Sequence, residues 1–506
     1  MLEFFVVFLF ALYMPTSNNP NVLLTYIGIY HEFELNRIER AASALMKDVA
    51  SLLVFQDIFR SPQAQAFLKV LLALRRGDDA LKLLDSYGEF FRLMAVGGYS
   101  SWEDYILDGI LIGEANPFAE AAASLGYPLN PWFGQIPPSL EAAAAADLEA
   151  LQRLSITEST LSGWVLELAD AKPEWRSAVT SSLSCHNGHK HLDDDEAHIG
   201  LSGLNEDNKR HSDKEDLLET SKVIDNLVIN REMWRKRIGG LWKWSEAMPL
   251  LKEYYPKHGV GRVATSQVLL LKGGKLVSDL KFFYRGKNHC ELTVHRSQRQ
   301  DIIGFLREHS LKYSPNHLLL CGPTGSGKSS LLHAISQKLV REGDLRVVTM
   351  PDTELKNLGF VLEELGKFCN VRFALFIDDP FARAGEENLR MIKSSLDENL
   401  QEWPENVFLI VTSNKPELYD GISSVTEGSS KWVELKHIFG RIIFLEKLNF
   451  DQFLQSVQEM LDHRKQRGFP ISVTTSLEIN DATIRWTQQR GVLNLRSAAQ
   501  LAKSLW

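Results

Sequence analysis

The clearest chemical pattern in the chain runs from Leu318 to Ser336, with the sequence LLLCGPTGSGKSSLLHAIS. It contains G-x-x-x-x-G-K-S between a strand-like apolar run and a helical pattern, which is the context that a phosphate-binding loop needs. Glycines let main-chain amides approach a phosphate without a Cβ in the way, and a helix N-terminus adds its positive dipole end. We therefore expect a nucleoside triphosphate to bind at Gly322, Pro323, Thr324, Gly325, Ser326, Gly327, Lys328, Ser329 and Ser330.

Three polar side chains of this motif have different expected roles. Lys328 would neutralise the outer phosphates, and Ser329 would offer its hydroxyl group to Mg²⁺. Ser330 also suits a plain role on the helix surface or as a cap. Below, residues 322–329 are called the phosphate loop.

Carboxylates that could act on a bound triphosphate follow in FALFIDD, residues 373–379. The apolar run is typical of a central strand in a parallel sheet. We expect Asp378 to orient the Mg²⁺ shell and Asp379 to polarise the attacking water. An acidic turn after a strand is the alternative. A further strand, VFLIVTSN, ends at Asn414, which would orient the water or contact the γ-phosphate, because ligands bind at the carboxyl edge of such sheets.

These elements must be positioned by an α/β fold. LRVVTM and GRIIFLEKL also have strand patterns, and TELKNLGFVLEELGKF and EENLRMIKSSLDENLQEW have helical ones. Alternation of strands and helices predicts a three-layer parallel sheet. We expect this nucleotide-binding core to occupy residues 291–450 and a helical C-terminal lid to occupy residues 451–506.

The first half of the chain has a different character. Residues 1–183 have mainly helical periodicity, including the alanine-rich SLEAAAAADLEALQRL, and predict an α-helical N-terminal domain. Residues 184–220 are rich in His, Asp, Asn and Lys, which indicates a flexible linker. Residues 221–290 would form a connecting region with a hairpin in VATSQVLLLKGGKLVSDL.

Two stretches of this half also permit a binding role. Cys185, His186, His189 and His191 have side chains that suit zinc, although their spacing matches no structural zinc pattern. REMWRKRIGGLWKW, residues 231–244, interleaves tryptophan with basic residues, as single-stranded nucleic acid sites do. Packing of Trp234, Leu241 and Trp244 on an amphipathic face is the favoured interpretation.

Composition limits the class of protein. The chain has 506 residues, a formal net charge of −8, 44% hydrophobic and 24% charged residues, which exclude collagen-like and wholly disordered classes. Four cysteines without a CxxC pair indicate free thiols in a reducing, intracellular compartment. The apolar N-terminus MLEFFVVFLFALYMP contains Glu3, lacks a basic region and is too short to span a bilayer, so we expect a buried helix there and no transmembrane anchor. A targeting or anchor segment is the alternative, and an organelle stays open.

From about residue 291 to the end, the chain resembles an AAA+ ATPase module and, more narrowly, the mainly bacterial domain of unknown function 815 family. The resemblance rests on ELTVHRSQRQDIIGFL, NHLLLCGPTGSGKSSLL, the Asp378-Asp379 pair, the VTSN strand and LRSAAQL. It implies ATP as the nucleotide, with Mg²⁺, water activation by Asp379 and Asn414 as sensor 1. Arg496 would be sensor 2, with an exposed helix arginine as the alternative.

One position departs from the family pattern and affects the expected assembly. Ile438 stands where the family usually has an arginine before its Phe-Gly pair, and Arg441 lies nearby. An arginine finger is worth three to five orders of magnitude in rate, so the departure leaves activation by a neighbouring copy, and a homo-oligomer, open.

Three functions compete at this point. The first is an ATPase whose cycle moves the lid and the N-terminal domain against an unidentified protein or nucleic-acid partner. The second is a nucleotide-dependent switch that binds ATP with little hydrolysis, since Asp379 is shorter than a glutamate. The third, a small-molecule kinase, lacks an identifiable acceptor site.

Overall fold

The computed structural model describes residues 37–77, 79–113, 116–125, 135–169, 230–279, 293–311, 317–342, 345–382, 385–396, 403–415, 439–466, 471–472 and 475–505. The apolar N-terminus, the His-rich segment 184–220 and Ile438 lie outside these residues. Within them, none of the helices is both long and apolar enough to cross a bilayer.

The chain divides into two compact units, and the first is helical, as predicted. It holds the described residues up to Ile110, those from Ala143 to Ala169, and Lys243–Ser245. A helix covers residues 37–51. The further elements are η1 (Gln56–Arg60), α3 (Pro62–Arg76), α4 (Ala80–Val96), α5 (Trp102–Ile112), α7 (Pro138–Leu154) and α8 (Glu158–Ala169).

Buried aromatic rings and one carboxylate organise this first unit. Trp102 stacks on Phe67 with ring centroids 4.2 Å apart and meets the ring of Phe90 edge-on. The buried carboxylate of Asp147 accepts main-chain N–H bonds from Leu53, Val54 and Phe55, the shortest of them 2.6 Å from Val54. These bonds satisfy main-chain donors at the turn before η1, including those of the buried residues Val54 and Phe55.

The second unit includes residues from Leu111 to Ala142 and from Glu246 to the C-terminus. Its first helices are α6 (Pro117–Ala123), η2 (Trp244–Ala247), whose first residues belong to the first unit, α11 (Met248–His258) and α12 (Gly261–Thr265). The described residues between Leu111 and Ala142 thus belong to the second unit. The boundaries at residues 183, 220, 290 and 450 stay predictions.

A seven-stranded sheet forms the centre of the second unit. Its strands are β1 (Val268–Lys272), β2 (Lys275–Ser278), β3 (Leu318–Cys321), β4 (Leu345–Thr349), β5 (Arg372–Ile377), β6 (Val407–Ser413) and β7 (Arg441–Phe444). They lie in the order β2-β1-β4-β5-β6-β3-β7, and every pairing is parallel except that of β1 with β2. The predicted parallel sheet is therefore confirmed.

The predicted hairpin is also present, but it has a role that its local sequence does not reveal. Gly273 and Gly274, both with positive φ, form the turn between β1 and β2. Strand β1 then pairs in parallel with β4, from Val268 opposite Val347 to Leu270 opposite Thr349. The hairpin thus extends the sheet of the nucleotide-binding core instead of standing apart in a connecting region.

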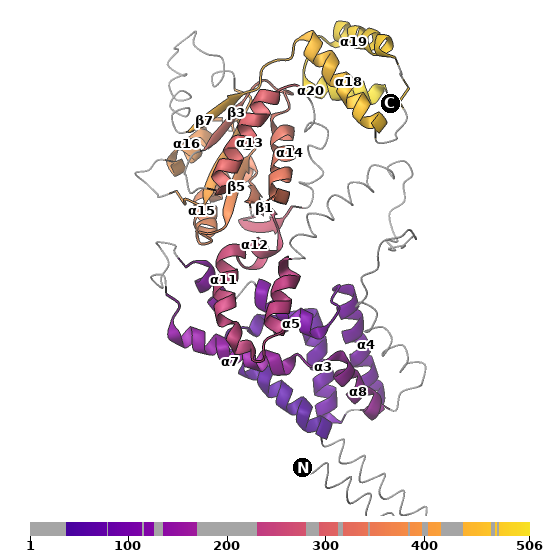
Figure 1. Ribbon diagram of the computed structural model, residues 1–506, viewed down its shortest axis with the longest axis vertical. Coiled ribbons are helices and arrows are strands. Elements are labelled where there is room, and N and C mark those ends of the chain that lie inside the picture. Colours follow the sequence, from indigo (N-terminus) through magenta and orange to yellow (C-terminus); the bar gives the residue numbers. More distant parts are fainter. Residues whose placement is uncertain are drawn as a thin grey trace, which may run out of the picture. The chain divides into compact units, whose positions relative to one another are not determined.

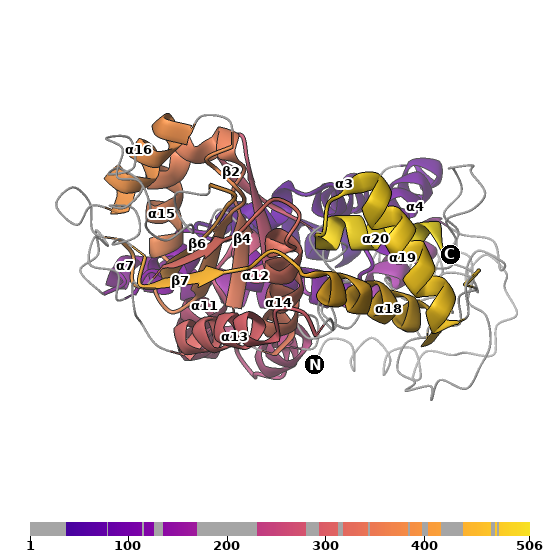
Figure 2. The ribbon, with the colours of Figure 1, turned by 90° about the horizontal axis from the view of Figure 1, so that it is seen from above.

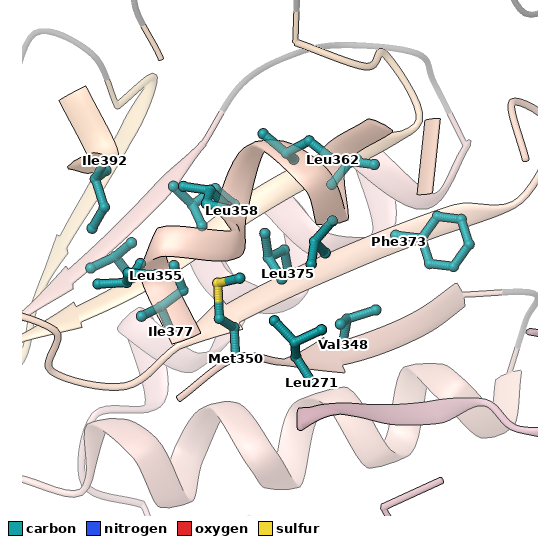
Figure 3. Packing of buried hydrophobic residues seen from close by; sticks show 14 of the residues in the cluster. Leu271, Val348, Met350, Leu355, Leu358, Leu362, Phe373, Leu375, Ile377 and Ile392 are labelled. Atoms are coloured by element: carbon teal, nitrogen blue, oxygen red, sulfur yellow. The ribbon is translucent and has the colours of Figure 1, made fainter. Parts of the chain in front are cut away.

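Helices cover both faces of the sheet, because almost every residue of its inner strands is apolar. Helices α13 (Arg296–Leu311) and α14 (Lys328–Glu342) lie on one face; η4 (Asp352–Asn357), α15 (Leu358–Gly366) and α16 (Gly385–Leu396) lie on the other (Figures 1 and 2). Successive strand residues alternate between the two layers: Phe373 and Leu375 contact α15, and Ala374 and Phe376 face the α13 and α14 side. Figure 3 shows the layer between the sheet and α15, in which Met350, Leu358 and Leu375 pack together.

Three C-terminal helices, called here the lid helices, are α18 (Phe450–Gln466), α19 (Ser476–Arg490) and α20 (Leu495–Ser504). Phe453, Val457 and Leu461 of α18 share a buried cluster with Leu495, Ala498 and Leu501 of α20. Thr475 and Glu478 form a reciprocal capping box at the start of α19, and Asn494 caps α20 by accepting the N–H of Ser497 at 2.8 Å.

The beginning of α20 lies directly against the phosphate loop. The main-chain N–H of Arg496 donates to the carbonyl of Gly325 at 3.3 Å, and the Asn494 amide donates to the carbonyl of Thr324 at 3.4 Å. Gly325 has φ of +83°, and a Cβ there would lie 2.6 Å from Nδ2 of Asn494. At Gly327, a Cβ would lie 2.7 Å from Cδ1 of Leu495. Two glycines of the motif are therefore needed for lid packing as well as for any ligand.

We predict that Gly325→Ala loosens the first turn of α20 from the phosphate loop. The new Cβ has no room beside Asn494, whose side chain is held by its capping bond, and the backbone conformation disfavours L side chains. Hydrogen exchange followed by mass spectrometry should show faster exchange at residues 495–498. Gly491→Ala is the control, because Gly491 also has a positive φ, +64°, but has no atom within 4 Å of the added Cβ. Unchanged exchange at α20 in Gly325→Ala would contradict the role of this contact.

Candidate functional site

The phosphate loop connects β3 to α14 and brings Lys328 into a buried polar setting. The side chain is 5% exposed, and its ammonium group donates to the carbonyls of Gly322 at 2.8 Å and Pro323 at 3.0 Å. It also donates to Oδ1 of Asn414 at 2.6 Å. Burial lowers the pKa of the Lys328 ammonium, and the carboxylates of Asp379 and Asp378 oppose this shift. The cation is thus held by neutral oxygens at the position where the motif meets phosphate.

The side chains of Ser329 and Asp378 are hydrogen-bonded to each other. The Ser329 hydroxyl donates to Oδ1 of Asp378 at 2.6 Å, and that carboxylate is exposed. The same oxygen accepts the hydroxyl of Thr412 at 2.6 Å, from the neighbouring strand β6. A hydroxyl and a carboxylate open to solvent are the hard oxygen donors that Mg²⁺ takes beside phosphate oxygens and water, so this donor set fits Mg²⁺.

The backbone takes an unusual conformation at Asp379, directly after Asp378. Strand β5 ends at Ile377, and Asp379 has φ of +44°, which is rare for a residue other than glycine. Its main-chain N–H donates to the Thr412 hydroxyl at 2.9 Å, and its carboxylate accepts the side-chain amide of Asn414 and, at 3.3 Å, the Asn414 main-chain N–H. Both aspartates follow the last residue of β5, so the alternation of side chains along a strand does not set the directions of their carboxylates.

Asn414 connects the two charged ends of the site. Its carbonyl oxygen accepts from Lys328, and its amide nitrogen donates to Asp379. An amide can do both at once because it carries a donor and an acceptor on one rigid group. The structure thus brings together Lys328, Asn414 and Asp379 in one network, and Ser329 and Asp378 beside it.

The other residues singled out from the motif lie around this network. Ser326 is buried and lies 3.4 Å from the Lys328 ammonium, whereas Thr324 is exposed and Ser330 is half-buried in the first turn of α14. The Arg496 side chain is exposed, and its charge adds to the lowering of the Lys328 pKa.

Arg441 lies away from the phosphate loop of its own chain. It begins β7 opposite Leu318, the first residue of β3, whereas the phosphate loop follows Cys321 at the other end of that strand. Its guanidinium lies 3.5 Å from the carboxylate of Asp301 on α13. Arg441 therefore forms an intramolecular ion pair at the end of the strands opposite to the phosphate loop.

The basic and aromatic stretch around residue 234 takes the packing role that we favoured. Trp234 and Trp244 are 4% and 1% exposed, and Leu241 is half-buried. Trp234 packs edge-on against Tyr254, with Arg237 above its ring. Cys185 and the three nearby histidines lie outside the described residues, within which no cluster of three metal-ligating side chains occurs. Cys321 and Cys369 are not in disulfide bonds.

Two residues of the site escaped the sequence analysis. Thr412 was expected only as part of the strand VFLIVTSN. Its hydroxyl group, at the end of a buried apolar strand, is a sequence feature that could have indicated a role in the site. Asn494 precedes the LRSAAQL helix as an ordinary cap would, and only the fold shows that it lies over Gly325.

Residues 285–506 match one family model, described as "Protein of unknown function (DUF815)". No curated protein sequence matches the chain. The motifs on which the resemblance rests, from ELTVHRSQRQDIIGFL to LRSAAQL, all lie within these matched residues.

Three of the solved structures similar to the chain have 14% to 17% sequence identity with it. The structure of C. elegans PCH-2 has 14% identity and a TM-score of 0.32, covering 46% of this chain and 67% of that one. Domain III of the Thermotoga maritima replication initiation protein DnaA has 17% identity and a TM-score of 0.27, covering 45% and 98%. Replication initiator DnaA bound to AMPPCP and single-stranded DNA has 16% identity and a TM-score of 0.30, covering 44% and 64%. Residues 285–506 thus match the DUF815 family model, and the parallel sheet with the phosphate loop between β3 and α14 has the predicted three-layer fold of a P-loop protein.

Proposed function

We propose that this chain binds ATP with Mg²⁺ at the phosphate loop and hydrolyses it, coupling the nucleotide state to movement against an unidentified protein or nucleic-acid partner. The observation that carries the proposal is the convergence of Lys328, Asp378, Asp379 and Asn414 at one edge of the sheet. Each of these side chains lies within hydrogen-bond distance of another member of the group or of Ser329.

The roles follow from the contacts. When phosphate enters, Lys328 can exchange the loop carbonyls for phosphate oxygens, because an ammonium group bonds more strongly to an anion than to a neutral acceptor. Ser329 and Asp378 would hold Mg²⁺, which neutralises charge that develops on the phosphate oxygens. Asp379 would accept a hydrogen bond from the water, and Asn414 would position it.

Coupling to a partner is supported by the contact between α20 and the phosphate loop. Arg496 and Asn494 bond directly to the carbonyls of Gly325 and Thr324. If a ligand displaces these carbonyls, the hydrogen bonds to α20 change directly, with no other residue between the phosphate loop and the lid helices. The choice of ATP among nucleotides rests on the family resemblance.

A second function, a nucleotide switch with little hydrolysis, is favoured by the bond between Asn414 and Asp379. That bond occupies the carboxylate which would have to meet the water. In addition, an aspartate withdraws its carboxylate by about one C–C bond, roughly 1.5 Å, relative to a glutamate, and misplacement by about 1 Å can cost a hundredfold in rate. The rate of γ-phosphate release separates the two functions.

Removal of the loop cation should abolish nucleotide binding without unfolding the chain. We predict that Lys328→Met weakens ATP binding at least about tenfold, because the charge that meets phosphate is lost while the buried stem is replaced by one of similar size. Fluorescence titration with an ATP analogue measures this. Lys338→Met, an exposed position on the same helix, is the control and should bind as the parent does. Equal affinity of Lys328→Met and the parent would remove the loop from the proposal.

The two carboxylates should separate into binding and chemistry. We predict that Asp379→Asn slows single-turnover hydrolysis at least about tenfold and changes ATP affinity little, because its charge acts mainly in the transition state. Asp378→Asn should instead weaken binding that depends on Mg²⁺. If Asp379→Asn hydrolyses ATP as fast as the parent, the water-activating role is wrong. If the parent binds ATP and releases no phosphate above buffer when concentrated, the switch function replaces the ATPase.

A further inference from the structure

Thr412 is buried and bonds to both aspartates of the site, to the side chain of Asp378 and to the main chain of Asp379. It is the penultimate residue of β6, has no exposed surface, and follows the apolar residues Leu409, Ile410 and Val411. Its hydroxyl donates to Oδ1 of Asp378 at 2.6 Å and accepts the main-chain N–H of Asp379 at 2.9 Å. The single donor of the hydroxyl and one of its acceptor sites are therefore both engaged by the residues that the proposed function uses.

The surrounding strand gives no structural reason for a hydroxyl group here. Valine has nearly the same shape, suits a strand as well and carries no polar group to bury. A buried hydroxyl is costly unless it is hydrogen-bonded, and both hydrogen bonds of the Thr412 hydroxyl go to the Asp378-Asp379 pair. The hydroxyl thus serves the two aspartates rather than the packing of the sheet.

Each of the two bonds restrains a different feature of the site. Ser329 and Thr412 bond the same oxygen of Asp378, so Thr412 still restrains this carboxylate when the Ser329 hydroxyl is engaged elsewhere. The bond to the Asp379 N–H holds a backbone with φ of +44°, a conformation that persists only where neighbouring groups impose it. One side chain therefore fixes the direction of the first carboxylate and the backbone that carries the second.

We propose that Thr412 is a positioning residue, which orients Asp378 for Mg²⁺ and keeps Asp379 in its left-handed conformation. This assignment rests on the proposed function, because it gives Thr412 a role only at a site that takes Mg²⁺ with nucleotide. Partners that bond to a ligating carboxylate typically contribute tenfold to a hundredfold in metal affinity. We therefore expect loss of the Thr412 hydroxyl to change the Mg²⁺ dependence of nucleotide binding more than the stability of the fold.

The experiment compares the full chain with Thr412→Val, which removes the hydroxyl, and with Thr412→Ser, which keeps it. The Mg²⁺ concentration that gives half-maximal binding of a fluorescent ATP analogue should rise about tenfold or more in Thr412→Val. Thr412→Ser should stay within about threefold of the parent, and binding of the analogue in EDTA should be alike in all three. Hydrogen exchange at residues 378–381 should be faster in Thr412→Val alone. Should Thr412→Val prove insoluble, Thr412→Ala removes the same hydroxyl without adding a methyl group.

Ser413→Ala is the matched control, because Ser413 is an adjacent buried hydroxyl that accepts from the Lys415 N–H at 3.1 Å rather than bonding to either aspartate. Parental Mg²⁺ dependence in Thr412→Val, or equal defects in Thr412→Val and Thr412→Ser, would overturn the assignment while leaving the proposed function in place. A parent that binds no nucleotide, or binds it without regard to Mg²⁺, overturns the proposed function and the assignment of Thr412 together. Binding measurements on the parent, without any variant, are enough to recognise that outcome.

Discussion

The register among three parallel strands is the constraint on which the site depends. Cys321 of β3 lies opposite Ser413 of β6, and Ile377 of β5 lies opposite Val411. Because the three strands end at nearly the same level, the phosphate loop, Asp378 and Asn414 follow at one edge. A shift of a single residue between β5 and β6 would exchange the faces of a whole strand and remove Thr412 from the aspartates.

The polar network at this edge also explains how a buried cation is tolerated. Lys328 is desolvated, and its pKa is lowered for that reason, yet the carbonyls of Gly322 and Pro323 and the Asn414 amide replace its water. These acceptors are neutral, so an incoming anion can compete with them. Asn414 couples this exchange to Asp379, since one amide bonds both groups.

Local signals made much of the fold predictable. The phosphate loop has a fixed spacing of glycines, lysine and serine, and the inner strands are continuous apolar runs, so β3 to β7 were expected near their observed positions. The contacts of Thr412, the positive φ of Asp379 and the approach of Asn494 to Gly325 could not be expected, because they join residues far apart in the sequence. The parallel pairing of β1 with β4 is another such case: the hairpin is visible in its glycines, and its neighbour in the sheet is not.

That extra pairing has a consequence for any fragment that begins where the family match begins. Residues 285–506 lack β1, whose main chain covers the outer side of β4; the N–H of Val347, for example, donates to the carbonyl of Gln267 at 2.9 Å. Without β1, the apolar strand LRVVT would become an edge with unpaired N–H and C=O groups. Exposed edges of this kind join to other chains, so such a fragment would tend to self-associate through β4 for reasons unrelated to nucleotide. Assembly should therefore be measured on a chain that retains Val268–Lys272, in which β4 is paired on both sides.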